Sequence, residues 1–366
     1  MQGYAIISFV SSEDLSKILL PGVSLETITP PTLPPLYLRR RRLLEPLDQG
    51  APKALIVMTP SGFGKSLLGA EWAEETPNIV WHSSTEKDNI AIVLNRMVSA
   101  LRRVYPGFAD WYDPTAVTIT NLEETIKHVT KNISETGETV NFVLENLEKM
   151  PLSNSPFVQI WTDNLPVNVR TLSLRKNPPH LSYERAASLG VLHYLTAFDL
   201  AFDKDEALQL AELLNVEVPE NLLQKMVTQM GGWPAGVRLI LEILAKDPQQ
   251  EDLKTLLISG EIASELQERL PGIDLAQVKS IDALIDILAE QILPGPVARK
   301  KNNVLLTPAE KRILVLLTSQ ITLVEVANKS HLSLNTVKSH LKSIYRKLGA
   351  DSRESAVRIA REQSLL

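Results

Sequence analysis

The sequence predicts a parallel α/β domain, followed by an all-α region and a small C-terminal domain of helices. Short apolar runs alternate with longer helical patterns between residues 37 and 196, which is typical of a parallel sheet with helices on both faces. Strand patterns end after residue 200, and the chain becomes strongly basic from residue 299. We therefore expect an unassigned N-terminal extension (1–35), an α/β domain (36–200), a helical domain with a linker (201–298) and a C-terminal domain (299–366).

Composition limits the class of protein. The 366 residues are enough for two or three domains. The chain has no cysteine, so disulfides, thiolate metal sites and cysteine nucleophiles are excluded. The N-terminal apolar run is too short for a membrane span and lacks the basic start of a signal peptide. We expect a cytoplasmic protein with no membrane contact.

Charge is distributed unevenly along the chain. The net charge is −5, yet residues 299–366 carry 13 Lys and Arg against 5 Asp and Glu, a net of +8. The preceding residues therefore carry a net of −13. A basic domain on an acidic body favours a polyanion such as nucleic acid as the partner, with a solvated basic segment as the alternative.

The elements of the α/β domain follow in order. Apolar runs predict strands at Ala54–Met58, Ile79–Ser83, Val140–Leu144 and Val169–Leu174. Helical patterns lie between them at Ser66–Glu75, Asp88–Val104 and Leu122–Ile133. Amphipathic helices are then predicted at Lys204–Leu214, Pro219–Met230 and Pro234–Leu244, and residues 246–298 are predicted to be mainly helical.

The first strand leads into Thr59–Ser66, with the sequence TPSGFGKS. The phosphate-binding pattern G-x-x-x-x-G-K-[ST] also lies between a strand and a helix, and this segment departs from it only at Thr59. Backbone N–H groups of such a loop and the helix N-terminus hold phosphates. Lys65 would reach the β- and γ-phosphates, and Ser66 would ligate Mg²⁺. We therefore expect a P-loop NTPase core that holds ATP or ADP with Mg²⁺ through Gly62, Phe63, Gly64, Lys65 and Ser66; a turn without a nucleotide is the alternative.

Capping signals divide the C-terminal domain into four helices. Thr307 and Glu310 form a capping box with Pro308 at the first helical position. Further helices are predicted at Thr322–Asn328, from Ser333 to Leu348, and at Ser352–Glu362. The residues at helical spacing that we expect in the core are Ile313, Leu314, Leu316, Leu317, Val326, Ala327, Val337, Leu341, Ile344, Tyr345 and Leu348.

The exposed face of the third of these helices is rich in groups that bind DNA. Asn, Thr, Ser and Lys read base edges, and Lys and Arg neutralise phosphates. A short turn joins this helix to the second, as in a helix-turn-helix recognition helix. We expect double-stranded DNA as the partner, with a small helical bundle of no such function as the alternative. The candidate contacts are Asn335, Thr336, Lys338, Ser339, Lys342 and Arg346.

This C-terminal segment resembles the output domain of the LuxR family. The resemblance rests on L-T-P-x-E, N-T-V-K-S-H-L-x-x-I-Y-x-K-L-G and S-R-x-x-A-V, and spans residues 305–364. It departs at Gln320, where the family usually has glycine. The resemblance implies a transcription regulator that binds promoter DNA, forms a homodimer through residues 352–362, and has RNA polymerase as a further partner.

The preceding part resembles the large ATP-binding LuxR-family regulators of the STAND class, to which the maltose-regulon activator belongs. Their phosphate loop is S-P-A-G-Y-G-K-T, and their R-x-R-L-L segment corresponds to residues 40–44. Their G-G-W-P-A-G turn corresponds to Gly231–Gly236. The resemblance implies Arg42 and Pro234 as further cofactor contacts, with a simple helix–helix turn as the alternative for the second segment.

Two strand ends carry the candidate catalytic residues. The family's L-D-D motif is L-E-N here, so the resemblance assigns Glu145 to Mg²⁺ or its water, whereas Asn146 replaces the acid that orients or deprotonates the attacking water. Arg175, in T-L-S-L-R-K-N-P-P, resembles the arginine near the γ-phosphate. The alternatives are an ordinary strand-end Glu and a surface Arg. The change at Asn146 predicts slow or absent hydrolysis.

Three interpretations of function follow. The first is a DNA-binding regulator switched by ATP, and the second is a regulator whose degenerate NTPase core is a protein-interaction scaffold. The third is an enzyme whose product is its function. In the first interpretation the chain is at most a slow ATPase that serves as a regulatory switch. Only residues 246–298 stand where the large regulators have a long helical-repeat sensor, so we expect the signal-binding surface to be reduced or to lie in residues 1–35.

Overall fold

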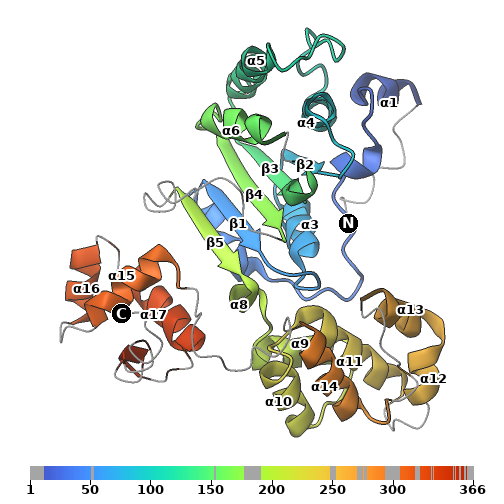
Figure 1. Ribbon diagram of the computed structural model, residues 1–366, viewed down its shortest axis with the longest axis vertical. Coiled ribbons are helices and arrows are strands. Elements are labelled where there is room, and N and C mark those ends of the chain that lie inside the picture. The colour runs from blue at the N-terminus through green and yellow to red at the C-terminus, as the bar shows by residue number, and fades with distance from the viewer. Residues whose placement is uncertain are drawn as a thin grey trace. The chain divides into compact units, whose positions relative to one another are not determined.

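The chain divides into two compact units, Met1–Ile292 and Leu293–Leu366 (Figure 1). In the first unit the computed structural model describes residues 12–50, 53–151, 154–176, 191–247, 253–269, 275 and 278–292. In the second unit it describes residues 306–317, 322–330, 332, 334–348, 350, 352, 353, 356, 357 and 360.

A parallel sheet of five strands, in the order β2-β3-β4-β1-β5, lies at the centre of the first unit. Its strands are β1 (Ala54–Met58), β2 (Ile79–Ser83), β3 (Val140–Glu145), β4 (Val169–Arg175) and β5 (Leu192–Thr196). The last residues of neighbouring strands pair: Met58 with Arg175, and Ser83 with Glu145. The carboxyl ends of the strands therefore meet at one edge, where β1 leads into the phosphate-type loop. The predicted parallel α/β fold is confirmed.

The strand β5 was not predicted from the sequence. It pairs with β1 at the edge of the sheet, and its burial alternates, with Leu192 and Leu195 buried and His193 exposed. An edge strand faces solvent along part of its length, so it lacks the continuous apolar run that marks the central strands.

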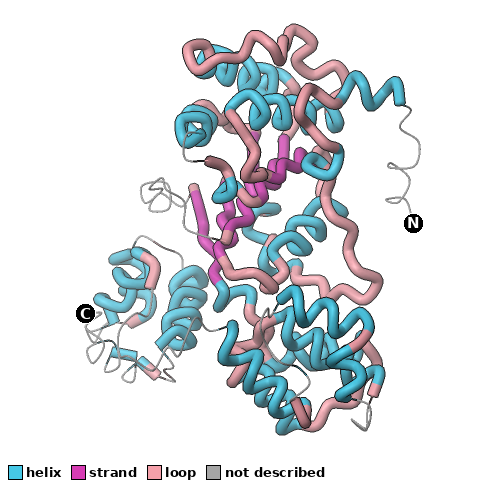
Figure 2. The backbone as a smooth tube through the Cα atoms, turned by 45° about the vertical axis from the view of Figure 1, so that its right-hand side comes forward, coloured by secondary structure: helices cyan, strands magenta, loops and turns pink. Residues whose placement is uncertain are grey.

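Helices cover both faces of the sheet (Figure 2). One face packs on α3 (Lys65–Glu75), whose Leu68 and Trp72 share a core with Val57. The other face packs in a second core with α4 (Ile90–Val104), α5 (Leu122–Glu135) and α6 (Ser155–Asp163). The short elements are α1 (Ser12–Ile18), η1 (Leu25–Ile28), η2 (Arg41–Leu43), α2 (Glu45–Asp48), η3 (Leu147–Lys149) and α8 (Ala197–Leu200).

The N-terminal segment packs on the α/β layer. Ile28 is fully buried in the same core as α4, and the Leu20 N–H donates to Ser99 Oγ at 3.0 Å. Residues 18–28 thus contribute to the core beside β2 and α4.

The helical part continues the core on the α3 side of the sheet. Its helices are α9 (Lys204–Leu213), α10 (Glu220–Thr228), α11 (Pro234–Lys246), α12 (Leu253–Ile258), α13 (Gly260–Arg269) and α14 (Ile281–Ile292). One apolar cluster runs from Leu55 and Leu68 through Met226 and Val237 to Leu288. This shared core makes the helical part and the sheet one compact unit.

The C-terminal unit is a separate helical domain. Its helices are α15 (Pro308–Leu317), α16 (Leu323–Ser330) and α17 (Leu334–Leu348). Ile313, Val326, Val337 and Ile344 are fully buried in one core. The predicted capping box is confirmed: the Thr307 N–H donates to Glu310 Oε2 at 2.7 Å, and the Glu310 N–H donates to Thr307 Oγ1 at 3.2 Å.

Candidate functional site

The loop after β1 is shaped by two glycines. Gly62 and Gly64 have φ of 82° and 79°, in the left-handed region that favours glycine. Gly64 is the N-cap of α3, so the loop ends at a helix N-terminus. A Cβ on Gly62 would lie 2.4 Å from the Trp233 ring. Any larger residue at position 62 would therefore collide with the helical part.

Lys65 is held within this loop. Its Nζ donates to the carbonyl oxygens of Thr59 at 2.7 Å and of Pro60 at 2.8 Å. Burial lowers the pKa of the Lys65 ammonium to about 8, against the opposing effects of Glu148 and Glu145. The side chain is still mainly charged at pH 7 and is placed for a phosphate oxygen.

Two expected Mg²⁺ ligands are brought together. Ser66 Oγ, at the start of α3, donates a hydrogen bond to Glu145 Oε1, at the end of β3. In the described part of the chain, this place included, no group of three or more His, Asp and Glu side chains could hold a metal ion. Ser66 and Glu145 would hold a Mg²⁺ ion that also binds phosphate oxygens, since Mg²⁺ is usually bound by few protein side chains together with substrate phosphates.

Asn146 follows Glu145 in the left-handed conformation, with φ of 58°. Asn and Asp tolerate this conformation better than most residues. Its backbone N–H donates to the Leu174 carbonyl at 3.1 Å, and its Nδ2 donates to Ser83 Oγ at 3.2 Å. The side chain lines the same pocket as Lys65.

Sequence reasoning missed Glu148. The short helix η3 turns the chain back after β3, so that Glu148 lines the pocket with Lys65. The Lys176 backbone N–H donates to Glu148 Oε1 at 2.7 Å. The negative charge of Glu148 raises the pKa of Lys65 more than the negative charge of Glu145 does. An acid three residues after a strand-end Glu was the available signal.

The pocket has a volume of about 580 Å³ and lies between the loop and the helical part. Among the described residues, its lining includes Arg40 and Pro234 but neither Arg42 nor Arg175. Arg40 is 6% exposed and donates to the Leu200 carbonyl at 2.7 Å. Arg42 is half-exposed and pairs with Glu206 at 2.7 Å.

The G-G-W-P-A-G turn contacts the loop directly. Trp233 Nε1 donates to the Ser61 carbonyl at 3.2 Å, and the Ala235 N–H donates to the Gly62 carbonyl at 3.0 Å. Pro234 occupies the first turn of α11, where a missing N–H has no cost. The loop and the helical part therefore share two hydrogen bonds.

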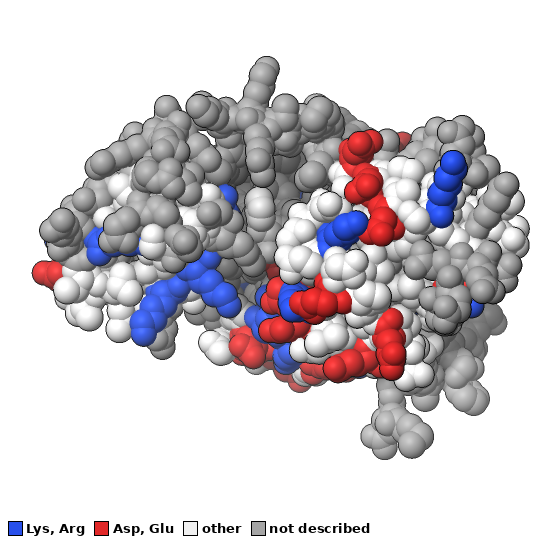
Figure 3. Space-filling model, turned by 90° about the horizontal axis from the view of Figure 1, so that it is seen from below, with Lys and Arg blue, Asp and Glu red and all other residues white. Residues whose placement is uncertain are grey.

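The candidate DNA face lies on α17. Lys338, Ser339 and Lys342 are exposed, and Thr336 is half-buried. Asn335 and Arg346 belong to the same helix, but their side chains lie outside the described residues. Figure 3 shows Lys and Arg side chains gathered on one face of this unit, whereas Asp and Glu are frequent on the helical part of the first unit.

A buried ion pair joins α15 to α17. Glu310 and Lys347 lie 2.7 Å apart, with side chains 4% and 3% exposed. Ser343 Oγ also donates to Glu310 at 2.7 Å. Glu310 thus caps α15 and anchors α17, a second role that its sequence pattern did not indicate.

Residues 304–360 match the family described as bacterial regulatory proteins, luxR family. The C-terminal domain belongs to the luxR family. The match contains α15, α16 and α17, and the predicted fourth helix lies mostly outside the described residues. Of that helix, Ala356 and Ala360 are described and are fully buried in the luxR domain core.

Curated relatives match a larger part of the chain. They include the serine/threonine-protein kinase PknK of Mycobacterium tuberculosis, 26% identical over 220 residues, and the HTH-type transcriptional regulator MalT of Vibrio parahaemolyticus, 22% identical over 210 residues. MalT of Yersinia pestis is 23% identical over 250 residues. The matches cover 55% to 66% of this chain but only 19% to 27% of the relatives. They confirm the resemblance to MalT-like regulators.

Two solved structures are similar at low TM-scores. A STAND protein with a tetratricopeptide repeat sensor from Pyrococcus horikoshii has a TM-score of 0.45 at 16% identity, covering 93% of this chain and 55% of that one. A Walker-type ATPase of Pyrococcus abyssi has a TM-score of 0.35 at 10% identity, covering 87% and 94%.

In the described residues, no helix is both long enough and apolar enough to span a membrane.

Proposed function

We propose that the chain is a transcription regulator whose luxR domain binds duplex DNA and whose α/β domain binds ATP or ADP with Mg²⁺ as a switch. The observation that carries the proposal is the loop Thr59–Ser66: it wraps Lys65, ends at a helix N-terminus, and places Ser66 against Glu145. This combination of cation, free N–H groups and metal ligands suits a nucleoside triphosphate.

Each part of the nucleotide would be bound by different residues. Gly62, Phe63 and Gly64 supply backbone around the phosphates, Lys65 neutralises them, and Ser66 with Glu145 holds the metal ion. Arg40 and Pro234 also line the pocket and are candidates for contacts with the nucleoside. Arg175 would act near the γ-phosphate only if its side chain left the opposite face of the sheet, because the structure places it in the lining there, while its backbone carbonyl accepts the Thr59 N–H at 3.1 Å. Arg42 would have to leave Glu206 to reach a nucleotide.

The switch would act through the helical part. Because Trp233 and Ala235 donate to loop carbonyls, a nucleotide that reshapes the loop changes the energy of these two bonds. A ligand shifts a conformational equilibrium only if it binds the two states with different affinity. The contact gives the nucleotide a physical route to such a difference.

DNA recognition gives the first prediction. Replacing Lys338 with Ala should weaken binding to a selected duplex by about 1–3 kcal/mol if the side chain reads a base. Replacing Arg346 with Ala should instead weaken all sequences alike and lower the salt slope by about 1. Fluorescence anisotropy over a salt series measures both effects.

The matched control is Arg312, an exposed cation on α15. Arg312→Ala removes the same charge from the same domain and should change affinity little. Equal losses for Lys338→Ala and Arg312→Ala would refute the assignment of α17 as the reading helix.

Hydrolysis gives the second prediction. Asn146 cannot accept a proton at neutral pH, and a missing general base typically costs about 10²–10⁴-fold in rate. The unmodified chain should therefore turn over ATP very slowly. Asn146→Asp, which keeps a residue tolerated at φ of 58°, should raise the steady-state rate with little change in ATP affinity.

Glu148 supplies the control for this experiment. Glu148→Gln should keep hydrolysis slow, and any effect should be on the affinity for ATP, because the charge of Glu148 raises the pKa of Lys65. Fast hydrolysis that Lys65→Ala and Glu148→Gln both abolish would assign the base to Glu148 and contradict the prediction.

A scaffold without nucleotide is the second candidate. The Asn at position 146 and the pairing of Arg42 with Glu206 favour it. Both candidate functions include three further proposals. These are self-association through residues 352–362, contact with RNA polymerase, and location in the cytoplasm with the DNA.

A further inference from the structure

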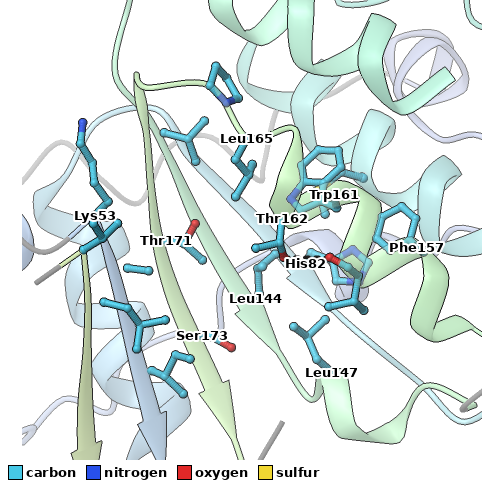
Figure 4. A pocket seen from close by; sticks show the side chains of 18 of the residues that line it. Lys53, His82, Leu144, Leu147, Phe157, Trp161, Thr162, Leu165, Thr171 and Ser173 are labelled. Carbon is cyan, nitrogen blue, oxygen red and sulfur yellow. Dashed lines mark hydrogen bonds between the residues drawn. The ribbon is translucent and has the colours of Figure 1, made fainter. Parts of the chain in front are cut away.

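A second cavity lies on the face of the sheet opposite α3 (Figure 4). Its volume is about 330 Å³, within the range of about 300–1,000 Å³ that is common for small-molecule sites. Residues of β1, β4, β5 and α6 line it. Most of its walls are apolar, and its largest apolar side chains are Phe157 and Trp161.

This cavity is separate from the nucleotide pocket. Successive side chains of a strand point to opposite faces of the sheet. On β4, Leu174 accordingly lines the nucleotide pocket, whereas Ser173 and Arg175 line the second cavity. Leu174 thus lies in the nucleotide pocket, and its two neighbours on β4 lie in the second cavity.

Three buried polar atoms of the lining residues have no hydrogen-bond partner among the residues that the structure describes: Trp161 Nε1, Ser173 Oγ and His82 Nδ1. Their side chains belong to residues at most 5% exposed. Figure 4 shows that Thr171 and Ser173 on β4 and Trp161 on α6 border the same space. Native structures pair nearly all buried polar groups, so three unpaired atoms around one cavity point to a ligand that supplies their partners.

The charges of the lining select the kind of ligand. Lys53 and Arg175 are its charged members, and the described lining contains no Asp or Glu. Lys53 is fixed at the rim, where its Nζ donates to the Val167 carbonyl at 2.6 Å. Burial lowers the pKa of the His82 imidazole to about 3, so that ring is neutral at pH 7. The surroundings therefore favour an anion and disfavour a cation.

We propose that this cavity binds a small organic carboxylate with an apolar, ring-sized body. The apolar walls cover the body, and the Trp161 N–H and the Ser173 hydroxyl donate to its oxygen atoms. Such a site would give the chain a signal-binding surface inside the α/β domain. The proposal does not rest on nucleotide binding, and its test uses no nucleotide.

The test compares three probes that share a 4-fluorophenyl ring: 4-fluorophenylacetate, its amide, and 4-fluorophenethylamine. Each is titrated into the full chain and followed by ¹⁹F line broadening. The acid should bind saturably with one site per chain, the amide more weakly, and the amine at least tenfold more weakly than the acid. Ser173→Leu, which puts apolar atoms into the cavity and removes a donor, should weaken the acid at least tenfold.

Two further variants fix the location. Trp161→Phe keeps a ring but removes the N–H, and should weaken the acid several-fold even if Ser173→Leu fails to fold. Lys65→Ala alters the pocket on the other face and should leave the acid unaffected. Absence of saturable binding, an amine that binds as well as the acid, or binding unchanged in both cavity variants would overturn the proposal.

Discussion

Glu310→Gln is expected to unfold the luxR domain at temperatures where the unmodified domain is folded. The substitution keeps the shape of the side chain but leaves the Lys347 ammonium, 3% exposed, without its counter-charge. Removing one partner of a buried pair typically costs about 3–5 kcal/mol. That is a large part of the roughly 5–15 kcal/mol that stabilises a domain.

Calorimetry of the full chain measures this effect as a lower melting temperature of one transition. The control is Glu325→Gln, which alters the exposed capping box of Thr322 and Glu325 at the start of α16. Its effect should be much smaller, because water replaces the lost partner. A melting curve of Glu310→Gln that matches the unmodified chain would show that the pair contributes nothing.

The same pair sets a pH dependence. Burial alone would raise the pKa of the Glu310 carboxyl, but hydrogen bonds from Lys347, the Thr307 N–H and Ser343 outweigh it and hold the pKa below its usual value. Because the folded pKa is lowered, the stabilisation is complete above the ordinary Glu pKa of about 4.3 and is lost as the pH falls through the lowered value. The difference in melting temperature between the unmodified chain and Glu310→Gln should therefore shrink below about pH 4.

Lys65→Ala is expected to abolish nucleotide binding. Lys65 is the cation that the loop itself holds, and its ammonium lies 2.7 Å and 2.8 Å from two loop carbonyl oxygens. A phosphate chain in this loop would lose its main counter-charge with the substitution. In the unmodified chain, Mg²⁺-ATP at 100 times its dissociation constant should add about 2.7 kcal/mol to the free energy of unfolding.

Thermal melting with and without millimolar Mg²⁺-ATP measures this difference. The matched control is Lys53→Ala, because Lys53 precedes the same strand but lies at its opposite end, outside the nucleotide pocket. This variant should keep the full stabilisation by ATP. If the unmodified chain melts at the same temperature with and without ATP, the scaffold interpretation is favoured instead.

Local patterns predicted much of the nucleotide site. The strand–loop–helix order fixed the place of Lys65 and Ser66, and the parallel sheet brought Glu145 to the same edge. Likewise, the helical spacing of Val337 and Ile344 correctly predicted the buried side of α17.

Contacts between distant segments could not be predicted in this way. Four arginines, Arg39–Arg42, follow one another, and the sequence alone does not say which one turns inward. Arg40 does so because Leu200, Phe202 and Glu206, far along the chain, surround its guanidinium.

The other contacts that the sequence did not predict are buried contacts between packed elements. Glu310 matched a capping pattern, but its contact with Lys347 depends on how α15 and α17 pack. Trp233 and Ser61 likewise meet only because the helical part packs on the loop. When a side chain has two roles, as Glu310 has, the sequence pattern indicates only the role within its own helix.

Nucleotide state should control DNA binding, and the affinity of the full chain for DNA shows whether it does. A duplex is selected by the full chain from a random-sequence pool, and its dissociation constant is then measured with and without saturating Mg²⁺-ATP. We expect ATP to change this dissociation constant by about 5–150-fold, the usual range of coupling between two sites, and to leave it unchanged in Lys65→Ala. Equal DNA affinity with and without ATP, in a chain shown to bind ATP, would contradict it.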